Sequence, residues 1–294
     1  MNETGRSIVI TVAPVHDCQN PVVLDPLRGR INPACRQWIL NPPDMIALEQ
    51  ALRIRDRIPG FRIRVVSIAP PSAERALREC LAVGADEVVR VWGEGVEEAD
   101  PHGLAVILAA AIRVRPFQLI LAGWRRADVE HAQTGPMLAE LLGLPQITCA
   151  RSIEMGRDSE SIRVEKRIPG RMLTMSCSLP ALVTMEKGPL LRYPRYPDRR
   201  RVSKIQIASV DLGAIGLAGV PPPLVQLERV TPPKPKRRSA LGAATGMPVV
   251  ARLQRILSGG AQAKKESNIR PCPDKVSTLK TVEHLLKEKL VLLP

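Results

Sequence analysis

Over its first 150 residues the chain alternates short apolar runs with amphipathic stretches. Four runs rich in β-branched residues are typical of buried strands, and they cover residues 7–12, 62–68, 87–91 and 118–122. Four further stretches have the apolar spacing that predicts helices, and they cover residues 41–57, 72–83, 100–115 and 133–143. Repeated strand–helix units predict an α/β fold with a mainly parallel sheet and helices on both faces.

Residues at the helix boundaries support this reading. Asn41-Pro42-Pro43-Asp44 places a good N-cap residue, prolines suited to the first turn and an acid that favours a helix N-terminus. Ser72 is expected to cap the second helix, and Asp100-Pro101 to open the third. Gly84 and Gly143 are expected to end the second and fourth helices.

A different pattern begins after residue 150. Two runs at 161–167 and 171–177 flank Pro169-Gly170, and this arrangement predicts a β-hairpin. The apolar run at 179–185 predicts one further strand. We therefore expect an α/β domain that covers residues 1–187 and includes the hairpin.

The rest of the chain is expected to contribute little to the core. Residues 188–276 are basic and rich in Pro and Gly, which predicts an extended segment, loosely ordered over much of 219–275. Within residues 277–294, apolar residues that include Leu285 again have the spacing of an amphipathic helix. A short amphipathic helix on an extended C-terminal arm docks on its own domain or on a partner.

Composition narrows the range of functions. Lys and Arg number 43 against 29 Asp and Glu, a formal net charge of +14, which favours contact with a phosphate, an acidic protein face or nucleic acid. Aromatic residues make up only 2 % of the chain. Single-strand nucleic-acid binding depends on aromatic stacking, so nucleic acid is not the expected partner.

Neither a metal site nor a membrane segment is predicted. No two of the six cysteines have C-x-x-C spacing, and no His stands near them at the spacing of zinc ligands. Residues 1–7 are not expected to form a signal or transit peptide, and no apolar run has the length of a membrane span. We expect a cytoplasmic bacterial or archaeal protein, with the mitochondrial matrix as the alternative location.

Three segments are expected to meet where open α/β sheets bind their ligands, beyond the carboxyl ends of the strands. They are the end of the first strand at 11–17, the helix start at 41–44, and the loop at 123–135. No nucleophile–base pair accompanies them, because His16 and His131 lie in these loops without a Ser or Cys that would complete a triad. The sequence therefore predicts a binding protein without catalytic residues.

The loop at 123–135 carries the most chemistry. It combines a glycine exit from a strand, two arginines, two acids and a helix start at Gln133-Thr134-Gly135. N–H groups at a helix N-terminus together with guanidinium groups make an anion site, and Asp128 and Glu130 can accept hydrogen bonds from ribose hydroxyls. A capped polar loop without a ligand fits the same residues, and Trp124 fits either stacking on a ring or covering the loop.

Five blocks of residues, in order along the chain, carry a resemblance to a known family. They are Asn41-Pro42-Pro43-Asp44 with Ala47-Leu48-Glu49-Gln50-Ala51-Leu52; Leu81-Ala82-Val83-Gly84-Ala85-Asp86; Asp128 with Ala132-Gln133-Thr134-Gly135-Pro136; Leu179-Pro180-Ala181-Leu182-Val183-Thr184; and Pro194-Arg195-Tyr196-Pro197. Through these blocks, residues 8–207 resemble the electron transfer flavoprotein β-subunit (FixA-like) family. One block alone is a weak signal, but five at near-family spacing are specific.

The resemblance implies a Rossmann-like, adenine nucleotide α-hydrolase-like fold and a heterodimer with an α subunit that carries the redox FAD. It implies AMP, or a second FAD, in this chain and no catalytic residues of its own. The pair would shuttle electrons between acyl-CoA-type or other dehydrogenases and an acceptor such as a quinone oxidoreductase.

Carried over residue by residue, the resemblance also implies two sets of functional positions. The cofactor-binding set is Thr11, Asn41, Pro42, Pro43, Asp44, Ile68, Gly123, Trp124, Arg125, Arg126, Asp128, Glu130, Gln133, Thr134 and Gly135. The partner-docking set is Leu190 or Leu191, in a recognition loop before Pro194, and Leu285 in the terminal helix.

The chain also departs from the family pattern. Ala13 stands where the family often has Lys, Arg125-Arg126 where it has Gln-Ala, and Glu130 where it has Asp. These departures bear on which nucleotide binds, and they leave a divergent β-like subunit without a nucleotide as one alternative. A stand-alone adenine-nucleotide-binding module is the other, although such a module has no need of a terminal docking helix.

Overall fold

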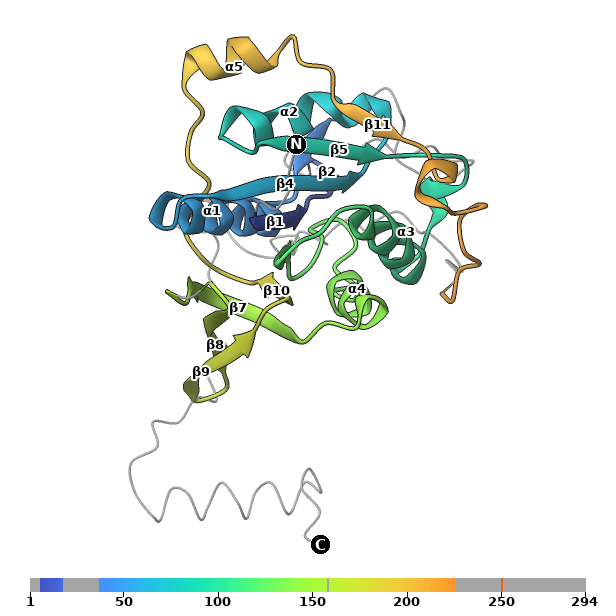
Figure 1. Ribbon diagram of the computed structural model, residues 1–294. Coiled ribbons are helices and arrows are strands. Elements are labelled where there is room, and N and C mark those ends of the chain that lie inside the picture. The colour runs from blue at the N-terminus through green and yellow to red at the C-terminus, as the bar shows by residue number, and fades with distance from the viewer. Residues whose placement is uncertain (1–5, 18–36, 158, 226–249, 251–294) are drawn as a thin grey trace, which may run out of the picture. The chain divides into compact units, whose positions relative to one another are not determined.

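The computed structural model describes most of the chain up to residue 225 (Figure 1). The described residues are 6–17, 37–157, 159–225 and 250. The chain divides into two compact units, Met1–Pro232 and Pro233–Pro294, and every element named below belongs to the first. The predicted terminal helix with Leu285 lies outside the described residues.

Nine strands of the described residues form one sheet in the order β11-β5-β4-β1-β6-β10-β7-β8-β9. In that order the strands are Ala208–Val210, Glu87–Val91, Phe61–Ile68, Arg6–Thr11, Leu119–Gly123, Ala181–Met185, Gln146–Met155, Ser161–Ile168 and Arg171–Ser178. Neighbours from β11 to β7 pair in parallel, whereas β7, β8 and β9 pair antiparallel. The predicted α/β fold, with its mainly parallel sheet and its β8–β9 hairpin, is confirmed.

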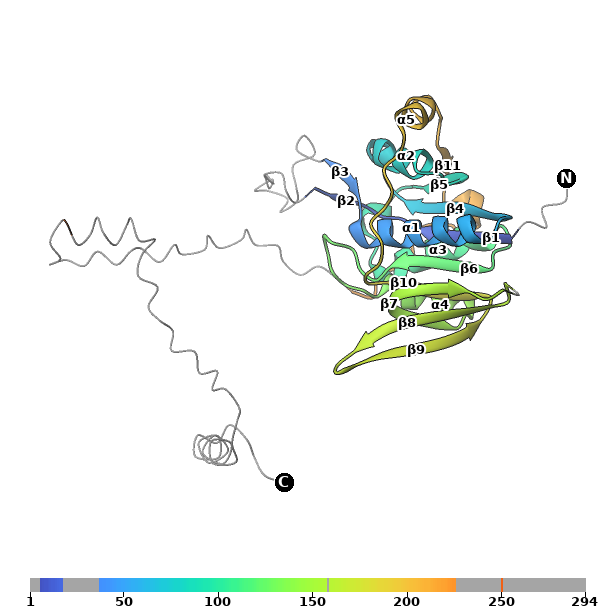
Figure 2. The ribbon, with the colours of Figure 1, turned by 90° about the vertical axis from the view of Figure 1, so that its left-hand side faces the viewer.

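Helices cover both faces of the parallel part of the sheet. Those on one face are α1 (Pro42–Arg57) and α2 (Glu74–Ala82), and those on the other are α3 (Pro101–Arg113) and α4 (Thr134–Leu142). Figure 2 shows α1 running along the strands of its face. Ile8 and Ile10 of β1 pack on the α1–α2 side, whereas Val9 packs on the α3–α4 side. Because both faces of β1 are buried, its sequence is a continuous apolar run.

The side-chain cap expected from the sequence forms at α3 but not at α2. The Asp100 side chain caps α3 as expected, because it accepts a hydrogen bond from Gly103 N at 2.8 Å. Ser72, in contrast, does not cap α2, since it lies inside a short 3-10 turn, Pro71–Ala73, that precedes the helix. Its hydroxyl oxygen accepts a hydrogen bond from the Trp38 indole at 3.0 Å instead.

Several elements were absent from the sequence-based expectation. Pro14–His16 (β2) and Trp38–Leu40 (β3) pair as a small antiparallel ribbon in a region expected to be a loop. Strand β7 joins β10 to the hairpin, and α5 (Tyr196–Val202) and β11 lie in the segment expected to be extended. Apart from β7 these elements have three to seven residues, too few to show a periodic pattern.

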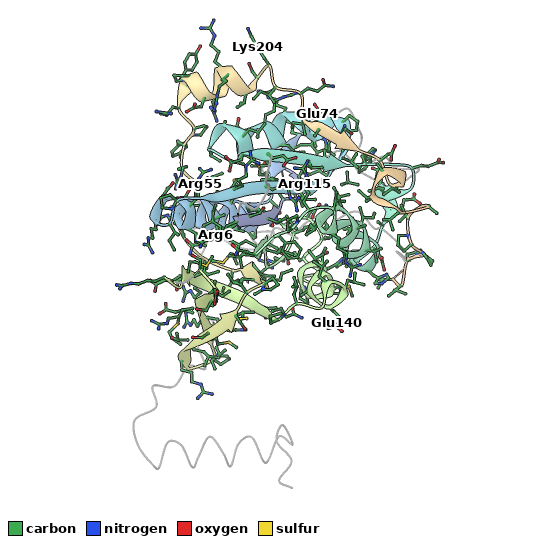
Figure 3. The ribbon with its side chains drawn as sticks, in the orientation of Figure 1. Arg6, Arg55, Glu74, Arg115, Glu140 and Lys204 are labelled. Carbon is green, nitrogen blue, oxygen red and sulfur yellow. The ribbon has the colours of Figure 1, made fainter. Side chains whose placement is uncertain are left out.

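The segment between β10 and β11 corrects the expectation of little core after residue 188. Val202 and Ile207 of this segment are buried, and so is Leu212 just after β11. The segment runs from β10 past α1 to α5, which packs against α2, and Lys204 marks the turn back toward β11 in Figure 3. This strap therefore completes the sheet by adding β11 at its far edge.

An ion-pair cluster fixes the strap to α1. The Arg192 guanidinium donates to the buried Glu49 carboxylate at 3.0 and 3.2 Å and to Asp56 at 2.8 Å. Burial alone would raise the pKa of Glu49, but the hydrogen bonds from Arg192 and Arg53 outweigh burial and lower it. A buried carboxylate with two guanidinium partners has its charge compensated, so Glu49 is a firm attachment point for the strap.

Candidate functional site

A pocket of about 450 Å³ opens at the carboxyl ends of β1, β4 and β6. The chain runs from β1 to β4 to β5 in one direction across the sheet and then returns through α3 to β6 on the other side of β1. The pocket therefore lies at the switch point of strand order, where open α/β sheets bind their ligands. Its volume is in the range of small-molecule sites.

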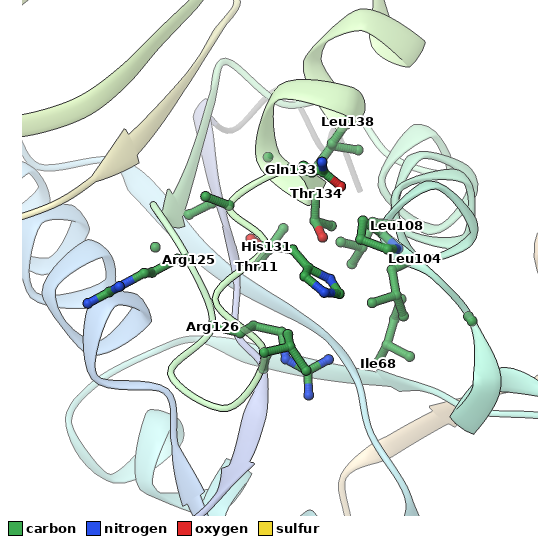
Figure 4. Close-up of a pocket in the computed structure, with 18 of the residues that line it drawn as sticks. Thr11, Ile68, Leu104, Leu108, Arg125, Arg126, His131, Gln133, Thr134 and Leu138 are labelled. Carbon is green, nitrogen blue, oxygen red and sulfur yellow. The ribbon is translucent and has the colours of Figure 1, made fainter. Parts of the chain in front are cut away.

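Segments far apart in the chain supply its walls. Thr11 lies at the end of β1 and Ile68 at the end of β4, and Leu104 and Leu108 line the pocket from α3. A further wall is the β6–α4 loop, from Gly123 to the start of α4, and Asp44, residues 97–101 and Val225 also line the pocket. Figure 4 shows His131 and Thr134 around the same space as Ile68, Leu104 and Leu108. The pocket thus has a polar side and an apolar side.

Asp44 joins the ends of β1 and β6 to the start of α1. Its two carboxylate oxygens accept hydrogen bonds from Gly123 N and Ala13 N, both at 2.8 Å. Burial raises the pKa of Asp44 to about 7, against the opposing effect of the Ala13 N–H, the Asn41 side chain and the Gly123 N–H. Asp44 is thus a structural acceptor that titrates near neutrality.

Asn41 holds the outer part of the β6–α4 loop. It stands at the N-cap position of α1, yet its side chain makes no capping bond. Instead its amide donates to Arg125 O at 2.9 Å, and its carbonyl oxygen accepts from Ala127 N at 3.0 Å. The cap expected at Asn41 is therefore replaced by a tether between the helix start and the loop.

Gly123 is required by the close approach of α1 to this loop. A Cβ at this position would lie 2.7 Å from Pro43 Cβ and 2.8 Å from Asp44 N, and it would also overlap an Asp44 carboxylate oxygen. Real Cβ atoms do not approach backbone atoms so closely, so any side chain would push the α1 start away from β6. The glycine lets the 41–44 corner and the loop meet.

The first residues of α4, Thr134 and Gly135, line the pocket. The first N–H groups of any helix have no partner within it, and Pro136 has no N–H, which leaves those of Thr134 and Gly135 at the opening turn. Gly135 allows this turn to pack on β10, because a Cβ there would lie 2.7 Å from Thr184 Cγ2. Such a turn favours an anion.

Both loop arginines are paired within the loop. Arg126 donates to Asp128 at 3.1 and 2.6 Å, and Arg125 pairs with Glu130 at 2.9 Å. The Arg125 guanidinium also lies 4.3 Å from the centre of the Trp124 ring, and in Figure 4 it points away from the space around His131. The two acids are thus engaged by arginines, and the positive charge that the loop offers a ligand is reduced.

The loop has two strained residues. Glu130 and Ala132 have φ of 55° and 56°, in the left-handed region that side chains rarely adopt. Such backbone costs about 1–3 kcal/mol per residue and clusters at ligand sites. Between them lies His131, which lines the pocket.

Ten of the predicted cofactor-binding residues line the pocket together. They are Thr11, Asp44, Ile68, Gly123, Trp124, Arg125, Arg126, Gln133, Thr134 and Gly135. Five others shape it from behind or pair with its loop: Asn41, Pro42, Pro43, Asp128 and Glu130. The structure therefore brings the predicted segments to one place, whereas their role in binding stays a prediction.

Some pocket residues were missed by the sequence reasoning. Leu104 and Leu108 lie four positions apart on α3, so they share one face of the helix. Because α3 begins beyond the carboxyl ends of the strands, this spacing could have indicated that the two residues line the pocket. Asp100 was read as a cap alone. Val225 also lines the pocket, and nothing in the Pro-rich sequence around it indicated that position.

The predicted docking leucines differ in exposure. Leu190 is 86 % exposed, and Tyr193 beside it is 95 % exposed. Leu191, in contrast, packs against the core on the α1–α2 side. Of the two, Leu190 is the side chain available to a partner.

Neither a metal cluster nor a membrane-spanning helix is found in residues 6–17, 37–157, 159–225 and 250. Among them no group of three or more His, Cys, Asp or Glu side chains lies close enough to hold a metal ion. Likewise, none of the helices in the described ranges is long and apolar enough to cross a membrane.

The doubly wound sheet and the pocket at its switch point define the class of the chain as a Rossmann-like α/β protein. Its residues 32–212 match the family model described as the electron transfer flavoprotein domain. The chain therefore belongs to the electron transfer flavoprotein family, among the electron-transfer subunits of the β (FixA) type, as its curated relatives show. The resemblance inferred from the five sequence blocks is thereby confirmed.

Three relatives illustrate the match. An electron transfer flavoprotein subunit beta of Thermoanaerobacterium thermosaccharolyticum is 33 % identical over 230 residues, which cover 74 % of this chain and 86 % of the relative. Protein FixA of Azotobacter vinelandii is 33 % identical over 216 residues, covering 69 % and 75 %. The caffeyl-CoA reductase-Etf complex subunit CarD of Acetobacterium woodii is 36 % identical over 178 residues, covering 60 % and 66 %.

Proposed function

We propose that this electron-transfer subunit binds an adenine nucleotide in the switch-point pocket and pairs with an α subunit that carries the redox FAD. The nucleotide is AMP or the AMP part of a second FAD. The observation that carries the proposal is the meeting of the Gly123 loop, the α4 N-terminus and the Asn41–Asp44 corner around one pocket.

The polar side of the pocket suits a phosphate. The N–H groups of Thr134 and Gly135 and the positive end of α4 favour negative charge. Arg126 adds a guanidinium that is paired with Asp128 but still lines the pocket. Because Asp44 has a pKa of about 7, a large part of its population is neutral near pH 7 and does not repel a phosphate.

The apolar side suits a flat, weakly polar ring. Ile68, Leu104 and Leu108 line it from β4 and α3. Contacts of this kind are typical of pockets that bury most of a small ligand and leave a few polar groups to fix its orientation. An adenosine placed with its base on this side would direct its phosphate toward α4.

In this role the chain performs no acid–base chemistry. The FAD of the partner subunit supplies the redox chemistry, and this chain holds the nucleotide, shapes the assembly and presents a docking surface. Leu190, exposed on a strap that Arg192 fixes to α1, is the proposed anchor for a dehydrogenase.

The electron donors we propose are acyl-CoA-type or other dehydrogenases, with a quinone oxidoreductase among the possible acceptors. One relative is named as a subunit of a caffeyl-CoA reductase-Etf complex, and another as an acryloyl-CoA reductase electron transfer subunit.

Residues 277–294 are proposed to dock on the α subunit, and the cytoplasm is the proposed location.

Co-expression tests the pairing. We expect the chain and an α subunit of the same family to co-purify as a yellow heterodimer with a flavin absorption spectrum. Replacing Leu190 with Ala should slow electron transfer from the dehydrogenase and leave the flavin content unchanged. A chain that stays colourless and monomeric beside a correctly folded α subunit would overturn the proposal.

A further inference from the structure

The Asp100 carboxylate makes more hydrogen bonds than a helix cap requires. One oxygen accepts from Gly103 N at 2.8 Å, which is the cap of α3. The other oxygen accepts from Leu224 N at 2.8 Å and from Val225 N at 3.1 Å. The buried Asp100 side chain therefore joins the start of α3 to a segment 124 positions later in the chain.

That segment reaches Asp100 along a packed path. After β11, Leu212 is buried against Val91, Val96 and Ile107, and Val220 packs at the edge of the same cluster. Val220 also faces Gly103, since a Cβ on that glycine would lie 3.7 Å from Val220 Cγ1. Residues 212–220 are thus held by apolar contacts, whereas Leu224 and Val225 are held by Asp100.

Val225 is the point at which this path meets the pocket. It lines the pocket together with Asp100, yet its side chain is 58 % exposed. An apolar side chain at the edge of a pocket loses its water contact when a ligand fills the space beside it, and burial of that surface stabilises the complex. The position of Val225 therefore affects how well the pocket holds a ligand.

We propose that Asp100 is a positioning residue that latches Leu224 and Val225 in place and thereby sets Val225 in the wall of the pocket, so that nucleotide binding and the position of this segment are coupled. This inference rests on the proposed nucleotide-binding function. Coupling of this kind is reciprocal: if the latched segment strengthens nucleotide binding, the nucleotide must strengthen the latch by the same factor.

The charge of Asp100 suits this role. The Gly103 N–H holds the pKa of the Asp100 carboxyl below its usual range, against the smaller opposing effect of burial, and the N–H groups of Leu224 and Val225 act in the same direction as Gly103. Hydrogen bonds that involve an ionised acceptor are about twice as strong as neutral ones. The latch is therefore closed at neutral pH.

Asp100→Ser separates the latch from the cap. Serine is as good an N-cap as aspartate, so it keeps the bond to Gly103 N, but it has no second oxygen for Leu224 and Val225. Asp211→Ser is the matched control, because the Asp211 carboxylate caps the short Gly213–Ile215 turn through Ala214 N at 2.7 Å and does not line the pocket. Val225→Ser removes the apolar wall and leaves the latch intact.

The test uses the purified heterodimer, AMP calorimetry and amide hydrogen exchange. We expect Asp100→Ser to weaken AMP binding about five- to tenfold, at the low end of the range that coupled sites show, and to speed exchange of the Leu224 and Val225 amides. AMP should slow that exchange in the wild type and in Asp211→Ser. Val225→Ser should weaken binding and leave the exchange of the free protein as in the wild type.

The outcomes separate the latch from the proposed function. Wild-type AMP affinity in Asp100→Ser, or exchange at 224–225 that AMP does not change, would overturn the latch while the nucleotide site stands. A wild-type heterodimer that binds neither AMP nor FAD at this pocket would overturn both. A merely structural role for Asp100 would lower the melting temperature without moving the AMP-dependent part of the exchange.

Discussion

Two buried aspartates, Asp44 and Asp100, hold opposite walls of the same pocket, and they do so in different electrostatic states. Each accepts backbone N–H bonds from segments far along the chain: Asp44 from Ala13 and Gly123, and Asp100 from Leu224 and Val225. Yet the pKa of Asp44 is raised to about 7, and the pKa of Asp100 is lowered.

The opposite shifts in pKa show whether burial or hydrogen bonding dominates at each aspartate. At Asp44 burial in the core costs the anion more than its N–H donors return, so the neutral acid is favoured. At Asp100 the N–H donors outweigh the smaller cost of burial, so the anion is favoured. One wall is therefore built from the core of the domain, and the other is attached to it by a charged hydrogen-bond acceptor near the surface.

The largest expected effect concerns the core-built wall. Gly123→Ala should lower the free energy of unfolding by about 3 kcal/mol, because a Cβ there overlaps Pro43 and Asp44 and an overpacked site must shift its backbone. Urea denaturation measures this. Gly219→Ala is the control, since a Cβ there meets nothing within 4 Å, and equal stability of the two variants would contradict the packing described at Gly123.

The pH dependence of the stability of Asp44→Asn tests the raised pKa of Asp44. The folded pKa of about 7 lies above the ordinary 3.8, so between these values the folded protein holds a proton that the unfolded chain has released. This contribution to stability is fully present below about pH 4, falls as the pH rises, and is gone above about pH 7.

Asparagine does not titrate, so the cost of Asp44→Asn should be larger at pH 5 than at pH 8. The expected difference is about 2.7 kcal/mol, from roughly two units of pH at 1.36 kcal/mol each. Denaturant unfolding at both values measures it. Over this range Asp100 stays ionised in both variants and cancels from the comparison, so a cost that grows with pH would contradict the raised pKa.

A smaller effect is expected at Asn41, which tethers the loop. Asn41→Ala removes partners of Arg125 O and Ala127 N and should cost about 1–2 kcal/mol of stability. Asn41→Asp keeps the bond from Ala127 N but sets a carboxylate oxygen against Arg125 O and beside Asp44, so it should cost at least as much as Asn41→Ala. Thermal unfolding of the three proteins measures these losses, and variants as stable as the wild type would contradict the tether.

The smallest effect is expected at the two arginines of the loop. Both form partly exposed ion pairs, so replacing either with Gln should change stability by at most about 0.5–1 kcal/mol. Arg126→Gln should weaken AMP binding a few-fold and reduce its salt dependence, whereas Arg125→Gln, whose guanidinium points away from the pocket centre, should not. Equal losses of affinity would mean that both charges reach the ligand.

The sequence predicts the core-built wall well, because its signals are local. The Asn-Pro-Pro-Asp start of α1, the apolar strands and the Gly-flanked loop each follow from short-range preferences, and parallel pairing then brings the ends of β1 and β6 together. Short-range preferences could not show that the Asn41 side chain hydrogen-bonds the β6–α4 loop instead of capping its own helix.

The latched wall could not be predicted, because it depends on contacts over more than 100 positions. Leu224 and Val225 lie in a Pro-rich stretch whose composition is typical of disorder. Likewise α5 and β11 are short, and they are held by contacts such as the pairing of Arg199 with Glu79 on α2. Local patterns therefore predict the α/β domain, whereas the path of the strap depends on contacts between distant parts of the chain.

Mass spectrometry of the small molecules released by denaturing the purified heterodimer tests the central claim most directly. The account predicts one adenine nucleotide for this chain in addition to the FAD of the α subunit: AMP, or a second equivalent of FAD. Thr134→Arg, which places a long side chain in the pocket that Thr134 lines at the opening turn of α4, should lose it and keep the α-subunit FAD. A wild-type heterodimer that releases one FAD and no second adenine nucleotide would contradict the account.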